Sequence, residues 1–204
     1  MKKAGLIILL TVYYLSAYTN PDSLTGIGNE PEYFPNSINN KWKYEISYPY
    51  GDKIDTVIVT IREDEIISGK TYKIWEYVYN TGKEFMYCYV SNDTVRFISP
   101  VNNEVIQMFL IPFEFELNNS WNNTESHYDR DKVTVKDIQD VVIKDIKYLD
   151  AIFIERNAYA RFNDIYSEHI WFKPYLGILK VRMHQRSLGP GNNETWELIE
   201  YSTK

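Results

Sequence analysis

Aromatic side chains at alternating positions in the middle of the chain have the clearest potential for chemistry. Trp75 and Tyr77, and then Phe85, Tyr87 and Tyr89, recur at every second position, as on one face of a β-strand. A row of aromatic rings can stack on sugar rings or line an apolar groove, and polar groups at its border can orient a ligand. We therefore predict a ligand-binding face composed of Trp75, Tyr77, Phe85, Tyr87, Tyr89, Arg96, Gln107 and Phe109.

The predicted turns determine which side chains share this face. Residues 79–83 are typical of a hairpin with a three-residue loop and a left-handed Gly82, which sets Trp75 opposite Tyr87 and Tyr77 opposite Phe85. Two-residue turns at 92–93 and 102–103 set Cys88 opposite Phe97, and Arg96 opposite both Tyr89 and Phe109. The other face of these strands collects aliphatic residues, so both faces are apolar. This pattern indicates either two layers or a closing barrel.

A second interpretation of the aromatic face requires no ligand. Opposite strands, or residues 21–40, would cover the rings and make them part of the core. Cross-strand aromatic pairs stabilise a sheet by roughly 0.2–1 kcal/mol each on their own.

The strands that must position these residues follow from the same alternation. Trp42, Tyr44, Ile46 and Tyr48 alternate with polar residues, which predicts a strand with one wet face. Further strand-like runs cover 55–62, 70–79, 83–91, 94–100, 104–111, 131–143, 148–158, 166–173, 177–186 and 195–202. We predict an all-β fold, an antiparallel meander of about ten strands that forms a strongly curled sheet or incomplete barrel; a two-sheet β-sandwich is the alternative.

Two segments are less regular. Residues 136–147 fit both a helical stripe and a strand, and their β-branched residues favour the strand. Residues 118–131 are expected to form an irregular loop rich in oxygen ligands, without the alternation of an EF-hand.

The N-terminus has the pattern of a signal peptide. Two lysines precede an apolar run at 4–15, which is too short to span a bilayer comfortably, and small residues follow at 16–17. We predict a signal peptide at 1–17, an extended lead-in at 18–40 and a single β domain at 41–204. The expected location is secreted, periplasmic or otherwise in the cell envelope, with no stable membrane span after cleavage.

Composition and motifs argue against several function classes. The net charge of −6 does not favour a nucleic-acid partner. The three histidines, His127, His169 and His184, have no metal-ligand spacing, and the single cysteine, Cys88, provides no thiolate zinc site. The sequence contains no phosphate-binding loop and no nucleophile elbow. We therefore expect a protein without a metal, a cofactor or an enzymatic activity.

Several short motifs resemble those of a family of uncharacterised secreted and lipoprotein β-sheet domains of bacteria. Tyr33-Phe34-Pro35 with Asn40-Lys41-Trp42-Lys43-Tyr44 resembles the "YFP…NxWxY" opening of that family, and Asn119-Ser120-Trp121 resembles its "GxSW" element. The run WFKPYLGILK at 171–180 resembles its "WYAxGVGxVK" stretch, and WELIEY at 196–201 resembles its closing strand. The resemblance implies an exported antiparallel β domain without an established activity. Its architecture is also similar to carriers of the lipoprotein-sorting type, whose curled sheet holds lipid.

Together these observations predict an exported envelope protein that binds an apolar ligand or a partner surface. Lipid, sugar and envelope protein are the expected partner classes. The alternatives are a carbohydrate-binding module, or a structural envelope component without a ligand.

Overall fold

The computed structural model describes residues 33–49, 54–67, 69–90, 94–101, 104–112, 116–122, 129–159, 165–186 and 193–203. The predicted signal peptide and residues 18–32 of the predicted lead-in lie outside these ranges, and the domain boundaries stay predictions. The described part of the chain contains twelve strands: β1 (Lys41–Ser47), β2 (Ile54–Ile67), β3 (Lys70–Tyr79), β4 (Gly82–Val90), β5 (Thr94–Val101), β6 (Glu104–Pro112), β7 (Ser120–Asn122), β8 (Arg130–Ile143), β9 (Ile146–Tyr159), β10 (Ile165–Lys173), β11 (Gly177–Arg186) and β12 (Asn193–Ser202).

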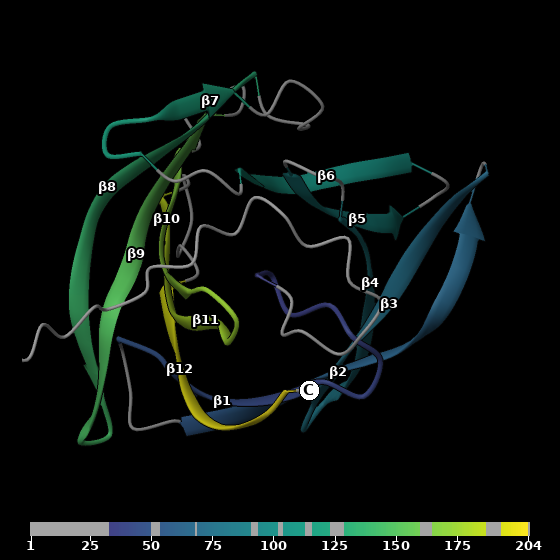
Figure 1. Cartoon of the computed structure of the whole chain (residues 1–204), viewed down its shortest axis with the longest axis horizontal. Coiled ribbons are helices and arrows are strands. Elements are labelled where there is room, and N and C mark those ends of the chain that lie inside the picture. The colour runs from purple at the N-terminus through teal and green to yellow at the C-terminus, as the bar shows by residue number, and fades with distance from the viewer. Residues whose placement is uncertain are drawn as a thin grey trace, which may run out of the picture.

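All twelve strands belong to one antiparallel sheet. Their order is β6-β5-β4-β3-β2-β1-β12-β11-β10-β9-β8-β7. Neighbouring strands of the sheet are therefore consecutive along the chain, except for β1 and β12, and β6 and β7 form its two edges. The sheet curls so that β3–β5 face β10–β12, but it does not close (Figure 1). The prediction of an all-β, strongly curled antiparallel sheet is confirmed, and the sandwich alternative is not the observed architecture.

The strands show the structure of the two segments whose sequence is less regular, 136–147 and 118–131. Residues 136–147 are not helical. They form the end of β8 and the start of β9, which are joined by a turn at Lys144 and Asp145. Both residues have positive φ, 46° and 69°, as in a type I′ hairpin turn. The expectation of an entirely irregular loop at 118–131 is wrong at Ser120–Asn122, where β7 pairs with β8 as an edge strand.

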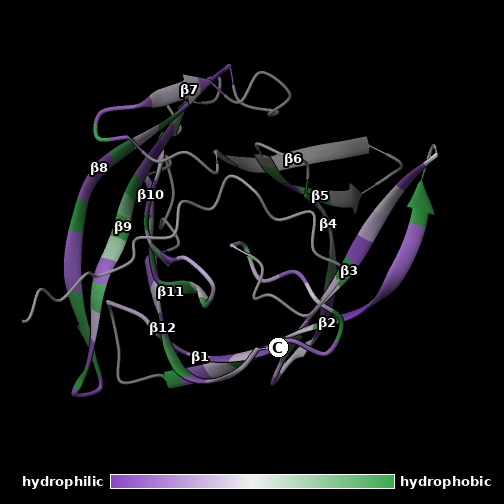
Figure 2. Cartoon of the chain, in the orientation of Figure 1, coloured by the Kyte–Doolittle hydropathy of each residue, from purple (hydrophilic) through white to green (hydrophobic). Residues whose placement is uncertain are grey.

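The core lies inside the curl, because alternate side chains point inward along each strand. Trp42, Tyr44 and Ile46 of β1 are buried as their alternation predicts. Figure 2 shows hydrophobic and hydrophilic residues following one another along β8 and β9. In the described residues no helix is long and apolar enough to cross a membrane.

Residues 33–40 contribute to this core from within the curl (Figure 1). The Phe34 side chain is only 2% exposed. Its ring stacks on Trp75 and Phe172, at centroid distances of 5.7 and 5.8 Å. The backbone of Asn39 and Asn40 extends the pairing of β1 with β2 by two hydrogen bonds to Ile61, of 2.8 and 3.0 Å. The segment therefore joins the two walls of the sheet.

The turn between β10 and β11 requires a glycine. Gly177 has a φ of +108°, and a Cβ there would lie 3.2 Å from Nε1 of Trp42. The same indole N–H donates a 2.7 Å hydrogen bond to the carbonyl oxygen of Leu176. The turn thus approaches β1 too closely for a side chain.

Candidate functional site: a cavity inside the curled sheet

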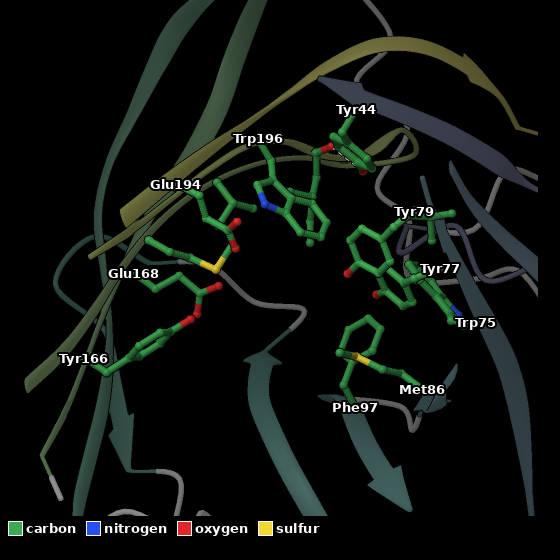
Figure 3. Close-up of a pocket in the computed structure, with 14 residues that line it drawn as sticks. Tyr44, Trp75, Tyr77, Tyr79, Met86, Phe97, Tyr166, Glu168, Glu194 and Trp196 are labelled. Atoms are coloured by element: carbon green, nitrogen blue, oxygen red, sulfur yellow. Dashed lines mark hydrogen bonds between the residues drawn. The ribbon is translucent and has the colours of Figure 1, made fainter. Parts of the chain in front are cut away.

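The inner face of the sheet lines a partly open cavity of about 230 Å³. Its lining comes from both walls of the curl, as Figure 3 shows for the labelled side chains. The lining residues are mainly aromatic or apolar, with two carboxylates: Tyr44, Val59, Trp75, Tyr77, Tyr79, Met86, Phe97, Tyr166, Glu168, Ile178, Val181, Met183, Glu194 and Trp196.

One wall of the cavity centres on Trp75, whose ring is packed against other aromatic rings and is hydrogen-bonded. Trp75 is 5% exposed, and its indole stacks on that of Trp42 with 5.2 Å between centroids. The ring of Phe97 meets it edge-on at 5.0 Å. Its Nε1 donates a 2.8 Å hydrogen bond to Oδ1 of Asn36. A ligand would therefore meet a preformed aromatic surface here.

Three further rings line the cavity between the walls. Trp196 of β12 lies 6.0 Å from Tyr44 of β1 and 6.2 Å from Tyr79 of β3, measured between ring centroids. The hydroxyl of Tyr44 donates a 2.9 Å hydrogen bond to the carbonyl oxygen of Ile178. Burial raises the pKa of Tyr44 and of Tyr77 far above the usual range of a phenol, so both stay neutral.

The opposite wall carries a buried acidic group. Glu168 of β10 is 8% exposed, and Nη1 of Arg156 lies 3.4 Å from its Oε2. Arg156 is engaged more closely by Asp131 of β8, whose two carboxylate oxygens accept hydrogen bonds of 2.9 and 2.6 Å from Nε and Nη2. Such a two-bond pair is the strongest form of this contact. Arg156 therefore forms its closer ion pair with Asp131 and a longer one with Glu168.

Burial raises the pKa of Glu168, and the nearby charge of Asp131 adds to the rise. Arg156 and the hydroxyl of Tyr166 lower that pKa in part. Glu194 of β12 behaves similarly: burial raises its pKa, the Trp196 side chain lowers it and Glu84 raises it. Both carboxyl groups of the cavity thus hold protons more tightly than a solvated Glu does.

The structure separates the predicted binding face into two sets. Trp75 and Tyr77 line the cavity. Trp75 pairs with Met86, and Ile74 pairs with Tyr87, so the predicted Trp75–Tyr87 and Tyr77–Phe85 pairings are wrong. The reason is the hairpin loop, in which Tyr79 pairs with Gly82 and two residues turn the chain instead of three. A shift of one residue moves Phe85, Tyr87 and Tyr89 to the outer face.

On the outer face, Tyr87 and Tyr89 pack against Tyr72 instead of Trp75. Tyr72 contacts Tyr87 and Tyr89, at centroid distances of 6.5 and 5.5 Å. The ammonium group of Lys70 lies 5.6 Å from the Tyr89 ring centre. Phe85 is 48% exposed. These residues lie on the far side of the sheet from the cavity.

The register beyond β4 follows the prediction for part of its length. Cys88 pairs with Phe97 and Tyr89 pairs with Arg96, as the sequence predicted. Arg96 then pairs with Leu110 and not with Phe109, because a bulge between Arg96 and Ile98 shifts the pairing by one residue. Gln107 pairs with Ile98 through the backbone. The side chains of Gln107 and Phe109 lie outside the described residues.

Sequence analysis did not single out Glu168, Glu194 or Trp196, although the sequence contains a signal for both acids. Glu168 stands in the apolar phase of its strand, between Tyr166 and Ile170. Glu194 stands in the same phase as Trp196 and Leu198. A carboxylate in the buried phase of an alternating strand is costly unless it is paired or used, so it marks a candidate site.

Within the described residues, no group of three or more His, Cys, Asp or Glu side chains is placed to hold a metal ion. Carboxylates, phenols and indoles are the groups available to a ligand in the cavity. They can accept and donate hydrogen bonds, attract positive charge and stack on apolar groups.

Comparisons with known proteins give limited similarity. No protein-family model matches the chain, and no curated protein matches it. A solved structure of a candidate lipoprotein from Parabacteroides distasonis has 14% sequence identity and a TM-score of 0.48, covering 86% of this chain and 100% of its own. A candidate exported protein with a YmcC-like fold from Bacteroides fragilis has 11% identity and a TM-score of 0.49, covering 85% and 100%.

Proposed function

We propose that this chain is an exported binding protein that holds a small, largely apolar molecule inside the curl of its sheet. The observation that supports this proposal is the cavity of about 230 Å³, whose aromatic lining comes from both walls. Concave, mainly apolar cavities with a few polar groups are the usual form of small-molecule sites. The proposed role is binding and not catalysis, because the sequence carries no catalytic motif.

The size of the cavity limits the ligand. An engineered apolar cavity of about 150 Å³ is large enough for benzene. The cavity here therefore suits one ring with a short substituent, or a short branched chain. A complete two-chain lipid does not fit in this volume, so the proposed ligand is smaller than the cargo of a lipid carrier.

Binding is tested by filling the cavity. Val181 lines it and is buried, so Val181→Phe would occupy ligand volume. Val142 of β8 is 62% exposed and serves as the matched control, Val142→Phe. Two-dimensional NMR with benzyl alcohol as the probe should shift cavity resonances in the natural protein and in Val142→Phe, but not in Val181→Phe. Absence of any shift in the natural protein, both with this probe and with a charged probe of the same shape, would contradict the proposed function.

We also propose that the chain reaches the envelope through the signal peptide at 1–17. The support is the charged start, the apolar run and the small residues at its end. Expression in a bacterium followed by fractionation should yield an envelope or secreted form whose intact mass corresponds to cleavage near Ala17. An uncleaved cytoplasmic product would contradict this proposal.

A further inference from the structure

The charges around the cavity have one sign. Two carboxylates, Glu168 and Glu194, line it, and none of the described lining residues is Lys, Arg or His. Figure 3 shows both acids on the wall opposite Trp75 and Tyr77. A ligand in this space would thus meet negative charge on one side and aromatic rings on the other.

The basic group behind the wall, Arg156, is shared between Glu168 and Asp131. Arg156 lies 3.4 Å from Glu168 but 2.6 Å from Asp131, so one guanidinium serves two carboxylates. Glu194 has no basic partner within salt-bridge distance among the described residues. Carboxylates that are buried or half-buried with one shared or no basic partner are costly to ionise, and a cation brought by a ligand would lower that cost.

The aromatic rings of Trp196, Tyr79 and Tyr44 would also attract a positively charged ligand. Trp196 and Tyr79 meet edge to face at 78°, and Tyr44 lies against the same indole. Aromatic faces attract ammonium groups through their quadrupole, most strongly in tryptophan, and more so when water is excluded. Trp196 carries an indole beside Glu194, so both attractions act on the same part of the cavity.

We infer that the cavity selects an organic cation, namely a small ammonium compound whose apolar part lies on the aromatic wall and whose charge faces Glu168 and Glu194. This inference rests on the proposed function and names its ligand class. Neutral molecules of the same shape bind more weakly, and anions are repelled. Burial raises the pKa of both acids, which is consistent with carboxylates that gain from a nearby positive charge.

The test compares three probes of nearly equal shape by calorimetric titration at neutral pH: benzylammonium, benzyl alcohol and benzoate. We expect benzylammonium to bind about tenfold more tightly than benzyl alcohol, and benzoate not to bind. If benzyl alcohol binds as tightly as benzylammonium, or benzoate binds, the cation inference is overturned while the proposed function stands. If none of the three binds, the proposed function fails.

Two variants assign the selectivity to the acids. Glu194→Gln and Glu168→Gln should each weaken benzylammonium binding about tenfold and leave benzyl alcohol binding unchanged. Glu197→Gln is the matched control, because this neighbouring β12 residue pairs with Lys180 and does not line the cavity. Glu194 is only half-buried, so its variant keeps the test decisive if Glu168→Gln folds poorly. Unchanged selectivity in folded Glu194→Gln would overturn the inference.

Discussion

The indoles of Trp42 and Trp75 stack almost parallel, at 14° between planes and 5.2 Å between centroids. Trp42 belongs to β1 and Trp75 to β3, so the contact spans the intervening strand β2. The stack makes Trp75 both a wall of the cavity and a central part of the core. A substitution of Trp75 would therefore change the stability of the core together with the lining of the cavity.

Truncation of Trp75 should be strongly destabilising. Trp75→Ala removes the stack on Trp42 and the hydrogen bond to Asn36, and leaves a large void. We expect a loss of about 3–5 kcal/mol in the free energy of unfolding, measured with urea. Phe85→Ala is the control from the same predicted face, and its exposed position predicts a change within about 0.5 kcal/mol. Equal effects would show that the two side chains share one environment.

A side chain at Gly177 should strain the turn before β11. Gly177→Ala adds a Cβ 3.2 Å from the Trp42 indole at a φ of +108°. We expect a loss of about 1–3 kcal/mol in unfolding free energy. Gly82→Ala is the matched control, because a Cβ at Gly82 has no heavy atom within 4 Å. A thermal unfolding series in which Gly177→Ala is no less stable than Gly82→Ala would refute the close approach.

Glu168 should make the ligand-free protein less stable as pH rises. Its pKa is raised above the reference of 4.5, so the native state binds this proton more tightly than the unfolded state. The stabilisation is complete below pH 4.5 and is lost as pH rises through the native pKa. Glu168→Gln removes this loss, so the stability of the variant relative to the natural protein should increase above pH 4.5. The slope cannot exceed about 1.4 kcal/mol per pH unit for one proton. Urea unfolding across pH 4–8 measures it, and a decrease would contradict the assignment.

The contribution of Glu76 to the free energy of unfolding should depend on pH in the opposite direction. It lies on the outer face, where Lys83 and Arg62 hydrogen-bond to its carboxylate and lower its pKa below 4.5. The stabilisation is present above pH 4.5 and disappears as pH falls through the native pKa. Glu76→Gln should cost about 1 kcal/mol at neutral pH, since both basic partners are half-exposed. In the same urea series the difference from the natural protein should vanish in acid; a difference that persists there would point to packing instead.

Local patterns predicted the strands well because alternation reports directly on which side of each strand is buried. Trp42, Tyr44 and Ile46 are the clearest example. The faces of β3 and β4 depended on a single loop, and a two-residue turn at Asn80 and Thr81 in place of a three-residue one exchanged inside and outside for Phe85 and Tyr87. Sequence around the turn does not determine that choice, since both loops are compatible with a glycine at its end.

The cavity could not be predicted from local sequence patterns, because it depends on the curvature of the whole sheet. Tyr77 and Glu168 come from distant parts of the sequence and face one another only because the sheet curls. Curvature arises from the accumulated twist and bulges of many strands, such as the register shifts at Ile61 and Arg96. Trp75 and Tyr77 were predicted as site residues from their alternation, and the placement of an acid in a buried phase was the other local signal.

The pairing of β1 with β12 has a consequence for folding. Every other neighbour in the sheet is consecutive along the chain, so those contacts close short loops, whereas this one joins the first and last described strands. Long loops close at a higher entropic cost, and contacts distant in sequence slow folding. We expect pulse-labelled hydrogen exchange to protect the β8–β9 hairpin before β1 and β12; the reverse order would contradict this. Because β12 links the two walls, we expect a nascent chain that ends at β11 to lack the cavity until the last strand is made.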